Sequence, residues 1–179
     1  MSYFKSRRSA VVAQNGSVAT SQPLAAQAGL QILRDGGNAI DAAVATAAVL
    51  NVVEPMSTGI GGDMFALIWD KTERKVVSLN GSGRQAAAAN VADVRKAGYE
   101  SIQNNGEGSQ FAVSVPGTVH GWETALNQYG RMTLREVLKP AIDYALNGFP
   151  VSEVIAHFWS SEDTVTKLNH RPSGREMLP

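Results

Sequence analysis

Apolar and polar positions follow a helical period in some stretches of the chain and a strand-like period in others, which predicts a mixed fold. The first helix is expected after Ser21, a residue type that caps helices, and Pro23, which suits the first turn. Gly36 and Gly37 should end this helix, because glycine adopts the left-handed conformation common at helix ends.

A second helix is predicted over "AIDAAVATAAVLNVV", residues 39–53, which is rich in alanine and apolar on almost every side. Asn38 should cap it, and Asp41 in its first turn should complement the helix dipole. Glu54 and Pro55 should end it. A helix without a polar face is usually buried and closely approached by its neighbours, so we expect this one in the core.

The run "MFALIWD", residues 64–70, is nearly continuously apolar and predicts a strand buried on both faces. Polar residues 71–74 then turn the chain into the alternating segment 75–80, which predicts a hairpin. We also expect short strands at residues 11–13 and 18–19, on either side of an Asn-Gly turn signal, and another at residues 111–115.

The second half of the chain is predicted to be mainly helical. A capping box at Thr133 to Glu136 opens one of these helices, which should run to Gly148. Ser152 should cap another helix that continues through Trp159. The remaining helical segments are residues 90–98 and 118–129.

Composition narrows the functional classes. The 179 residues are 44% hydrophobic and 18% charged, enough for one domain with a core. Sixteen basic residues balance sixteen acidic ones, so neither a nucleic-acid nor a membrane partner is predicted. The absence of cysteine excludes disulfides, thiolate metal sites and a cysteine nucleophile. No apolar run has the length of a signal-peptide core or of a membrane span, so a cytoplasmic location is expected.

The segment "LNGSGRQAAAAN", residues 79–90, has the composition of a ligand-binding loop. Gly81 and Gly83 allow close approach of another group, and Arg84 carries a permanent charge suited to a carboxylate or phosphate. An ordinary turn, a dinucleotide-phosphate loop and a carboxylate clamp are all compatible with this pattern. The dinucleotide interpretation requires a parallel sheet, whereas the preceding strand is predicted to lie in an antiparallel hairpin.

The other candidate motifs give no complete catalytic set. Gly59 to Asp63, "GIGGD", lacks the lysine of a phosphate loop and favours a tight crossing in which Asp63 accepts bonds from loop amides. No serine stands in the G-x-S-x-G pattern, and His120, His157 and His170 lack metal-binding spacing. The residues themselves therefore predict no catalytic side chain, no metal site and no cofactor.

Two long segments carry a more specific signal. "SQPLAAQAGLQILRDGGNAIDAAVATAAVLNVVEPMSTGIGGDMFALIWD" and the later "VSVPGTVHGWETALNQYGRMTLREVLKPAIDYALNGFPVS" resemble the γ-glutamyltranspeptidase family in the same order and with the same intervening hairpin. The similarity extends from about Val11 to about Val154. It implies an α+β fold, part of the four-layer αββα sandwich of N-terminal nucleophile hydrolases, with helices packed on an antiparallel sheet.

The resemblance also implies an enzyme made as a precursor. Such proteins cleave themselves into a large and a small subunit, and the new N-terminal threonine of the small subunit attacks the substrate. Members transfer or hydrolyse γ-glutamyl groups, typically of glutathione, and related branches deacylate cephalosporins or hydrolyse other small amides. Four threonines of this sequence do not stand in the nucleophile motif, namely Thr118, Thr133, Thr164 and Thr166.

Residues 1–179 are therefore expected to form a single incomplete domain, the N-terminal portion of the large subunit. Alone it should be inactive, with sheet edges and apolar faces left exposed. The expected partners are the remainder of the precursor, which includes the small subunit, and a small γ-glutamyl or acyl-amide substrate. A heterodimer or higher oligomer is the expected assembly. The alternatives are an inactive homologous fragment that serves binding or assembly, and the dinucleotide-binding domain.

In typical members an Asp-x-Arg-Glu segment after this hairpin supplies the arginine that holds the substrate's α-carboxylate. Asn80 stands at the position of the aspartate, Ser82 at that of the arginine, and Arg84 two positions later. Along a strand these two positions share a face, so the resemblance implies Arg84 and Ser82 as substrate-binding residues. Asp63 replaces a glycine of the family's usual loop, and both differences resemble the acylase-like or amidohydrolase-like branch.

Overall fold

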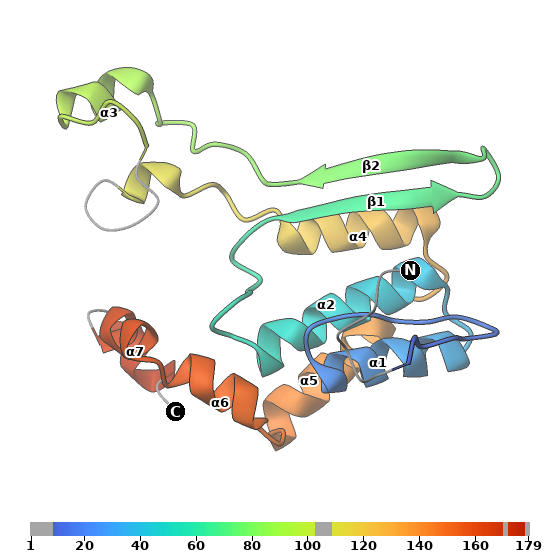
Figure 1. Cartoon of the computed structure of the whole chain (residues 1–179). Coiled ribbons are helices and arrows are strands. Elements are labelled where there is room, and N and C mark those ends of the chain that lie inside the picture. The colour runs from blue at the N-terminus through green and yellow to red at the C-terminus, as the bar shows by residue number, and fades with distance from the viewer. Residues whose placement is uncertain (1–8, 103–108, 170–171, 178–179) are drawn as a thin grey trace, which may run out of the picture.

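The computed structural model describes residues 9–102, 109–169 and 172–177. Its layers run from a β-hairpin, through α4, to a group of three helices, α1, α2 and α5 (Figure 1). The elements in chain order are α1 (Pro23–Arg34), α2 (Ala39–Val53), β1 (Met64–Asp70), β2 (Lys75–Gly81), α3 (Val91–Lys96), η1 (Ser109–Ala112), α4 (Thr118–Tyr129), α5 (Leu134–Asn147), α6 (Glu153–Trp159), α7 (Glu162–Asn169) and η2 (Pro172–Met177).

Helix α1 begins one residue later than predicted. Gln22 is the N-cap, and its side-chain oxygen accepts hydrogen bonds from the amides of Leu24 and Ala25. The expected cap, Ser21, instead donates its hydroxyl to the Glu54 carboxylate at the end of α2, at 2.6 Å. The helix ends before Gly36, whose φ of 98° is of the kind that glycine tolerates, so the predicted end is confirmed.

Helix α2 begins with the predicted cap, and the two capping residues also contact the loop after α4. Asn38 and Asp41 form a complete capping box at its start. The Asp41 carboxylate is fully buried and also accepts bonds from the amides of Arg131 and Met132, at 3.0 and 3.1 Å. The Asn38 side chain donates to the carbonyl of Tyr129 at 2.6 Å. The start of α2 is thereby attached to the loop between α4 and α5.

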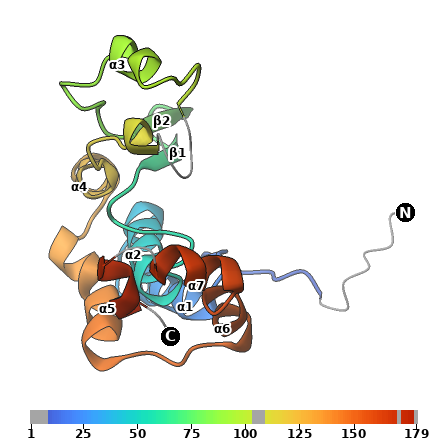
Figure 2. The ribbon, with the colours of Figure 1, turned by 90° about the vertical axis from the view of Figure 1, so that its left-hand side faces the viewer.

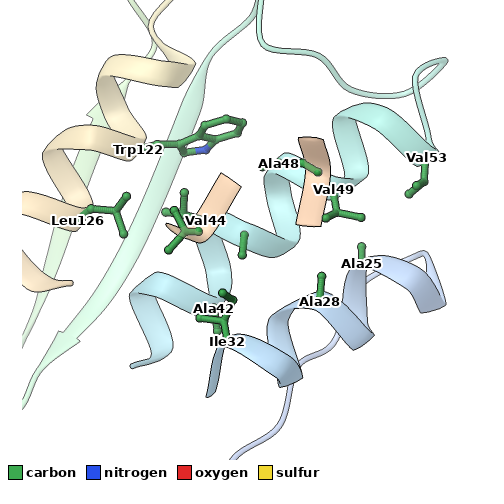
Figure 3. Close-up of a cluster of buried hydrophobic side chains, with 13 residues drawn as sticks. Ala25, Ala28, Ile32, Ala42, Val44, Ala48, Val49, Val53, Trp122 and Leu126 are labelled. Carbon is green, nitrogen blue, oxygen red and sulfur yellow. The ribbon is translucent and has the colours of Figure 1, made fainter. Parts of the chain in front are cut away.

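The core lies around α2 and is built from small side chains. Figure 3 shows Trp122 and Leu126 of α4 pointing toward α2, whose other side packs on alanines of α1. The helices α1 and α2 approach closely at Gly29, where a β-carbon would lie 2.2 Å from the Thr46 hydroxyl oxygen. The prediction of a buried, closely packed helix over residues 39–53 is confirmed.

The hairpin forms as predicted, with β1 antiparallel to β2 and Met64 opposite Gly81. The expectation that β1 is buried on both faces is wrong. Ile68 is buried, but Phe65, Leu67 and Trp69 are 63%, 80% and 62% exposed. The reason is that α4 covers only one face of the hairpin in the described part of the chain, and no second layer covers the other (Figure 1).

The other predicted strands do not form. Residues 11–13 and 18–19 belong to no strand, and residues 111–115 contribute to η1 and a single bridge from Ser114 to Gln85. A strand needs a neighbour to satisfy its backbone groups, and among the described residues these segments have none beyond that bridge. Their β-branched composition is a weak determinant without such a neighbour.

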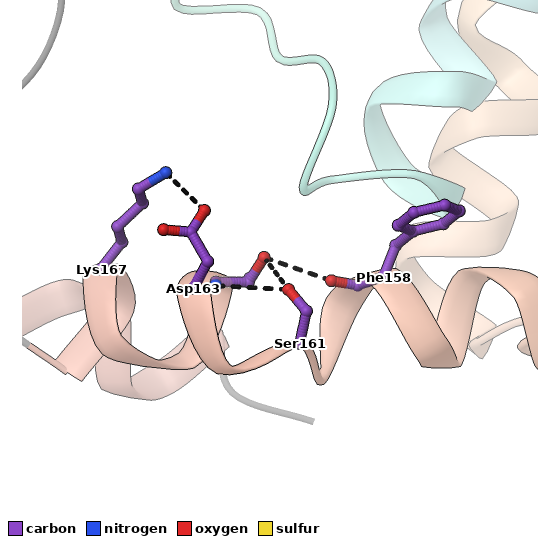
Figure 4. A network of polar contacts seen from close by, with 5 residues as sticks. Phe158, Ser161, Asp163 and Lys167 are labelled. Atoms are coloured by element: carbon purple, nitrogen blue, oxygen red, sulfur yellow. Dashed lines mark hydrogen bonds and ion pairs between the residues drawn. The ribbon is translucent and has the colours of Figure 1, made fainter.

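The helices of the second half begin where their caps predict. Thr133 and Glu136 form the capping box of α5, and Ser152 caps α6. Helix α7 follows α6 directly, and the Ser161 hydroxyl lies at the junction between them. It donates to the Thr164 hydroxyl oxygen at 2.9 Å, while Lys167 pairs with Asp163 along the outer surface of α7 (Figure 4).

Candidate functional site

The loop that follows β2 leaves the strand abruptly. The strand ends at Gly81, and the Ser82 amide donates to the Asn80 side-chain oxygen at 3.0 Å, which turns the chain. Gly83 then has a φ of 79°. Strand alternation therefore does not continue to Arg84, and the expectation that Ser82 and Arg84 share a strand face is wrong.

Four glycines from two segments pack against each other beside this loop, and we call them the glycine junction: Gly81, Gly83, Gly117 and Gly121. A β-carbon on Gly83 would lie 1.8 Å from the carbonyl oxygen of Val115, and one on Gly117 would lie 2.2 Å from that of Gly81. Real side chains cannot approach so closely, so the loop crosses the start of α4 through direct backbone contact.

A third segment meets the same place. The carbonyl oxygen of Gly62, in the glycine-rich loop before β1, accepts bonds from the amides of Gly117 and Thr118 at 3.0 and 3.2 Å. This satisfies a first-turn donor of α4, which has no side-chain cap. The loop is a crossing from helix to strand, as predicted. However, the Asp63 carboxylate accepts no hydrogen bond among the described residues, so its predicted contact with loop amides is wrong.

The backbone of Arg84 is anchored by a hydrogen bond, whereas its side chain is exposed and unpaired within the described residues. Its carbonyl accepts a bond from the Val115 amide at 2.8 Å, which anchors the residue beside the junction. The side chain is exposed and has no hydrogen bond or ion pair within the described residues. A guanidinium held at the surface of a rigid backbone crossing is available to bind an anion from solution.

Ser82 is half-buried, and its hydrogen bonds are to neighbouring backbone and to Ser114. Its hydroxyl donates to the carbonyl of Gly83 at 3.3 Å, and its own carbonyl accepts from the Ser114 hydroxyl at 3.2 Å. The structure thus places Ser82 and Arg84 on one loop, with Ser82 half-buried and hydrogen-bonded to Gly83 and Ser114, and Arg84 exposed to solvent.

Other polar groups near the junction do not add a catalytic set. Thr118 is buried, and its hydroxyl is without a partner in the described residues. His120 is exposed, and its backbone carbonyl accepts a hydrogen bond from the Thr124 hydroxyl. Within residues 9–102, 109–169 and 172–177 no three His, Asp or Glu side chains gather to hold a metal ion. In the same residues no helix is long and apolar enough to cross a bilayer.

The dinucleotide interpretation does not fit this geometry. It requires a parallel strand pair and a helix directly after the glycines, so that the helix N-terminus meets the pyrophosphate. Here β2 is antiparallel to β1, and α3 begins only at Val91, after a non-helical segment. Gly81 and Gly83 let two backbone segments pack directly against each other, and they do not form a phosphate-binding loop.

The order of elements around the junction agrees with the comparisons. The sequence profile of the γ-glutamyltranspeptidase family matches residues 25–178. The chain belongs to this family. Among solved structures, cephalosporin acylase from Bacillus halodurans is 48% identical, with a TM-score of 0.80 over 93% of this chain and 31% of that one. Helicobacter pylori γ-glutamyltranspeptidase is 32% identical, with a TM-score of 0.81 over 94% of this chain and 47% of that one.

Among curated proteins, the glutathione hydrolase-like YwrD proenzyme of Bacillus subtilis is 48% identical over 143 residues, 79% of this chain. The chain spans only 26% of that relative's length. Membership of the γ-glutamyltranspeptidase family confirms the α+β, N-terminal nucleophile hydrolase fold, and the acylase neighbour supports the acylase-like branch.

One part of the site could not be predicted from a motif. The contact of Gly62 with Gly117 joins two segments that are distant in sequence. The sequence Pro116-Gly117 predicts that a strand or helix ends there, but it does not predict which segment packs against Gly117.

Proposed function

We propose that this chain is the N-terminal part of the large subunit of a γ-glutamyltranspeptidase-like amide hydrolase, and that Arg84 binds the carboxylate of its substrate. The observation that carries the proposal is the position of Arg84. Its backbone is fixed beside the glycine junction, and its charged end is exposed and unpaired in the described residues. A planar guanidinium binds a carboxylate through two parallel hydrogen bonds.

Family membership and the exposed charge of Arg84 support a proposed substrate class. The substrate is a small amide whose acyl part carries a carboxylate, as a γ-glutamyl group or a dicarboxylic acyl group does. The attacking hydroxyl comes from polypeptide beyond the described residues. Of the threonines described, Thr118 is buried within α4 and Thr133 caps α5, so neither is placed as a free N-terminal nucleophile.

The test uses the complete protein, meaning the polypeptide encoded by the whole reading frame that contains this sequence. Hydrolysis of a γ-glutamyl anilide is measured for the unmodified protein and for Arg84→Ala. Loss of a charge-assisted hydrogen-bonded pair costs about 1.5–3 kcal/mol, so KM for the anilide should rise roughly tenfold to a hundredfold. The kcat should change much less, because the carboxylate is distant from the scissile bond.

Two controls separate this role from general damage. Arg95→Ala removes an exposed arginine of α3 and should leave KM unchanged. An anilide whose α-carboxylate is replaced by an amide should be hydrolysed equally by the unmodified protein and by Arg84→Ala. An unchanged KM for the γ-glutamyl anilide in Arg84→Ala would remove the binding role. A complete protein without any amidase activity would favour the alternative of an inactive binding or assembly module.

We also propose that the remainder of the precursor covers the open face of the hairpin. Phe65, Leu67, Trp69 and Val76 are each more than 60% exposed on this face. Isolated two-stranded hairpins are marginally stable in water, and large exposed apolar patches mark interaction sites. A second sheet stacked on this face would supply the missing layer of the αββα sandwich.

A further inference from the structure

Both polar groups of the Ser82 backbone are held by side chains. The Ser82 amide donates to the Asn80 side-chain oxygen at 3.0 Å, and the Ser82 carbonyl oxygen accepts from the Ser114 hydroxyl at 3.2 Å. The carbonyl of Arg84, two residues later, accepts from the amide of Val115 at 2.8 Å. The backbone is therefore fixed on both sides of the intervening glycine, which restricts where the Arg84 side chain begins.

The hydrogen bond from Ser114 joins two segments that are distant in sequence. Asn80 lies two residues before Ser82, whereas Ser114 lies 32 residues after it. An antiparallel bridge between Gln85 and Ser114 joins the same two segments. The stretch between them carries α3 and η1, and it lies on the side of the hairpin away from α1, α2 and α5 (Figures 1 and 2). Ser114 therefore fastens the end of this stretch to the loop that carries Arg84.

Burial differs between the two ends of this arrangement. Ser82 and Ser114 are half-buried, whereas Arg84 is exposed. Water competes less for a partly shielded hydrogen bond than for an exposed one, so the bond from Ser114 can hold the backbone in one place. An arginine side chain that starts from a fixed backbone loses less conformational freedom when it binds an anion.

We propose that Ser114 is a positioning residue, whose hydroxyl holds the Ser82 carbonyl and thereby orients Arg84 toward the carboxylate of the substrate. The inference rests on the proposed function, because it takes Arg84 as the group that binds the substrate. Ser114 acts through the loop and not by contact with the substrate. Removal of its hydroxyl should therefore weaken binding of the carboxylate and leave the chemical step nearly unchanged.

Kinetics of the complete protein test this role with the γ-glutamyl anilide. Loss of one hydrogen bond in Ser114→Ala should raise KM about twofold to tenfold, with a much smaller change in kcat. Ser114→Thr keeps a hydroxyl on the same carbon and should restore most of the KM. Ser160→Ala is the matched control, because it removes a hydroxyl that donates to the Ala156 carbonyl of α6 at 2.7 Å, and it should leave KM unchanged. A normal KM in Ser114→Ala would overturn the proposal.

A double-mutant cycle separates positioning from general damage to the fold. If Ser114 acts through Arg84, Ser114→Ala should change KM little in a protein that already carries Arg84→Ala. It should also have little effect on the anilide whose α-carboxylate is replaced by an amide. A KM that rises by the same factor with and without Arg84 would overturn the positioning role and indicate a general structural effect.

Hydrogen–deuterium exchange separates failure of this inference from failure of the proposed function. The Val115 amide, which donates to the Arg84 carbonyl, should exchange at least about tenfold faster in Ser114→Ala than in the unmodified protein, because both bonds join the same two segments. Unchanged protection of this amide in Ser114→Ala would overturn the inference and leave the role of Arg84 intact. A normal KM in Arg84→Ala, together with lost protection in Ser114→Ala, would instead contradict the proposed function and, with it, the positioning role.

Discussion

Asp41 shows how one side chain can hold distant parts of this chain together. Its buried carboxylate accepts bonds from the amides of Asn38, Arg131 and Met132. A β-carbon on Gly130 would lie 2.7 Å from the same carboxylate, so the loop approaches it without an intervening side chain. The start of α2 and the loop between α4 and α5 therefore meet around a single acidic group.

Replacement of Asp41 by asparagine should destabilise the protein. The asparagine amide presents donors where the loop amides also donate, and an unsatisfied buried donor costs about 1–3 kcal/mol. We expect the free energy of unfolding to fall by that amount in urea denaturation followed by circular dichroism. The matched control is Asp143→Asn, which breaks only an exposed pair with Lys139 and should cost about 0–1 kcal/mol. Equal effects of the two changes would contradict the role of Asp41.

Glu136 gives a prediction about pH. Its carboxylate accepts bonds from the hydroxyl and the amide of Thr133, at 2.6 and 2.7 Å, and these bonds hold the pKa of Glu136 below its usual 4.5. The pKa is thus lower in the folded state than in the unfolded one. The contribution of this cap to stability is present above the unfolded value and is lost as the pH falls through the folded one.

An NMR titration of the Glu136 carboxyl carbon checks this. Thr133→Val removes the hydroxyl donor, which is the largest cause of the lowered pKa, and should move the pKa of Glu136 up toward 4.5. Thr166→Val, on the exposed side of α7, should leave it unchanged. A pKa of Glu136 already at 4.5 in the unmodified protein would show that the cap does not form in solution.

Among the elements, the loop after β2 depends most on glycine. Gly83 has a φ of 79° and no room for a β-carbon, whereas Gly98 has a φ of 86° and nothing within 4 Å. Alanine at Gly98 should cost only the backbone term, about 1–2 kcal/mol. Alanine at Gly83 should cost roughly 1–3 kcal/mol more, because the carbonyl of Val115 must move.

The free energies of unfolding of Gly83→Ala and Gly98→Ala are compared by urea denaturation. Because both glycines have a positive φ, the difference between the two losses measures the steric cost at the glycine junction alone. In the complete protein, Gly83→Ala should also raise KM for the γ-glutamyl anilide, because Arg84 follows directly. If both variants lose the same stability and keep the same KM, the junction does not position Arg84.

The elements also show which features a sequence reveals. Caps such as Asn38 with Asp41, and Thr133 with Glu136, act within one helical turn, so their residue types predict helix starts closely. Burial depends on what lies across space: the apolar run of β1 predicted two covered faces, and only the resemblance to a longer family protein predicted that an apolar face would be exposed. Residues 111–115 likewise have strand composition without a neighbouring strand beyond one bridge.

The candidate site also has features that the sequence predicted and features that only the folded structure shows. Similarity to the family indicated Ser82 and Arg84 by position, but their different surroundings follow from the positive φ of Gly83. The pairing of Gly117 with Gly81 and Gly62 depends on three segments that only the folded chain brings together. Backbone approach of this kind leaves no residue-type signal other than glycine itself.

At the scale of the whole molecule, the open face of the hairpin predicts dependence on further polypeptide. Leu67→Asp places a charge at the centre of this face and should sharply reduce the yield of soluble, processed complete protein, because burying an unpaired charge is costly. Thr72→Asp, in the exposed turn between β1 and β2, is the matched control and should be neutral. Yield is measured by size-exclusion chromatography of the purified protein, and normal yield of Leu67→Asp would contradict a covered face.

The attachment of α2 to the loop between α4 and α5 also bears on synthesis. Asp41 and its amide partner Arg131 are 90 residues apart in the sequence. A ribosome therefore completes the apolar helix α2 well before it makes the backbone that this carboxylate binds. During that interval the apolar side chains of α2 and the Asp41 carboxylate lack the partners that α4 and the loop after it supply, so this helix is exposed to aggregation until that backbone has been made.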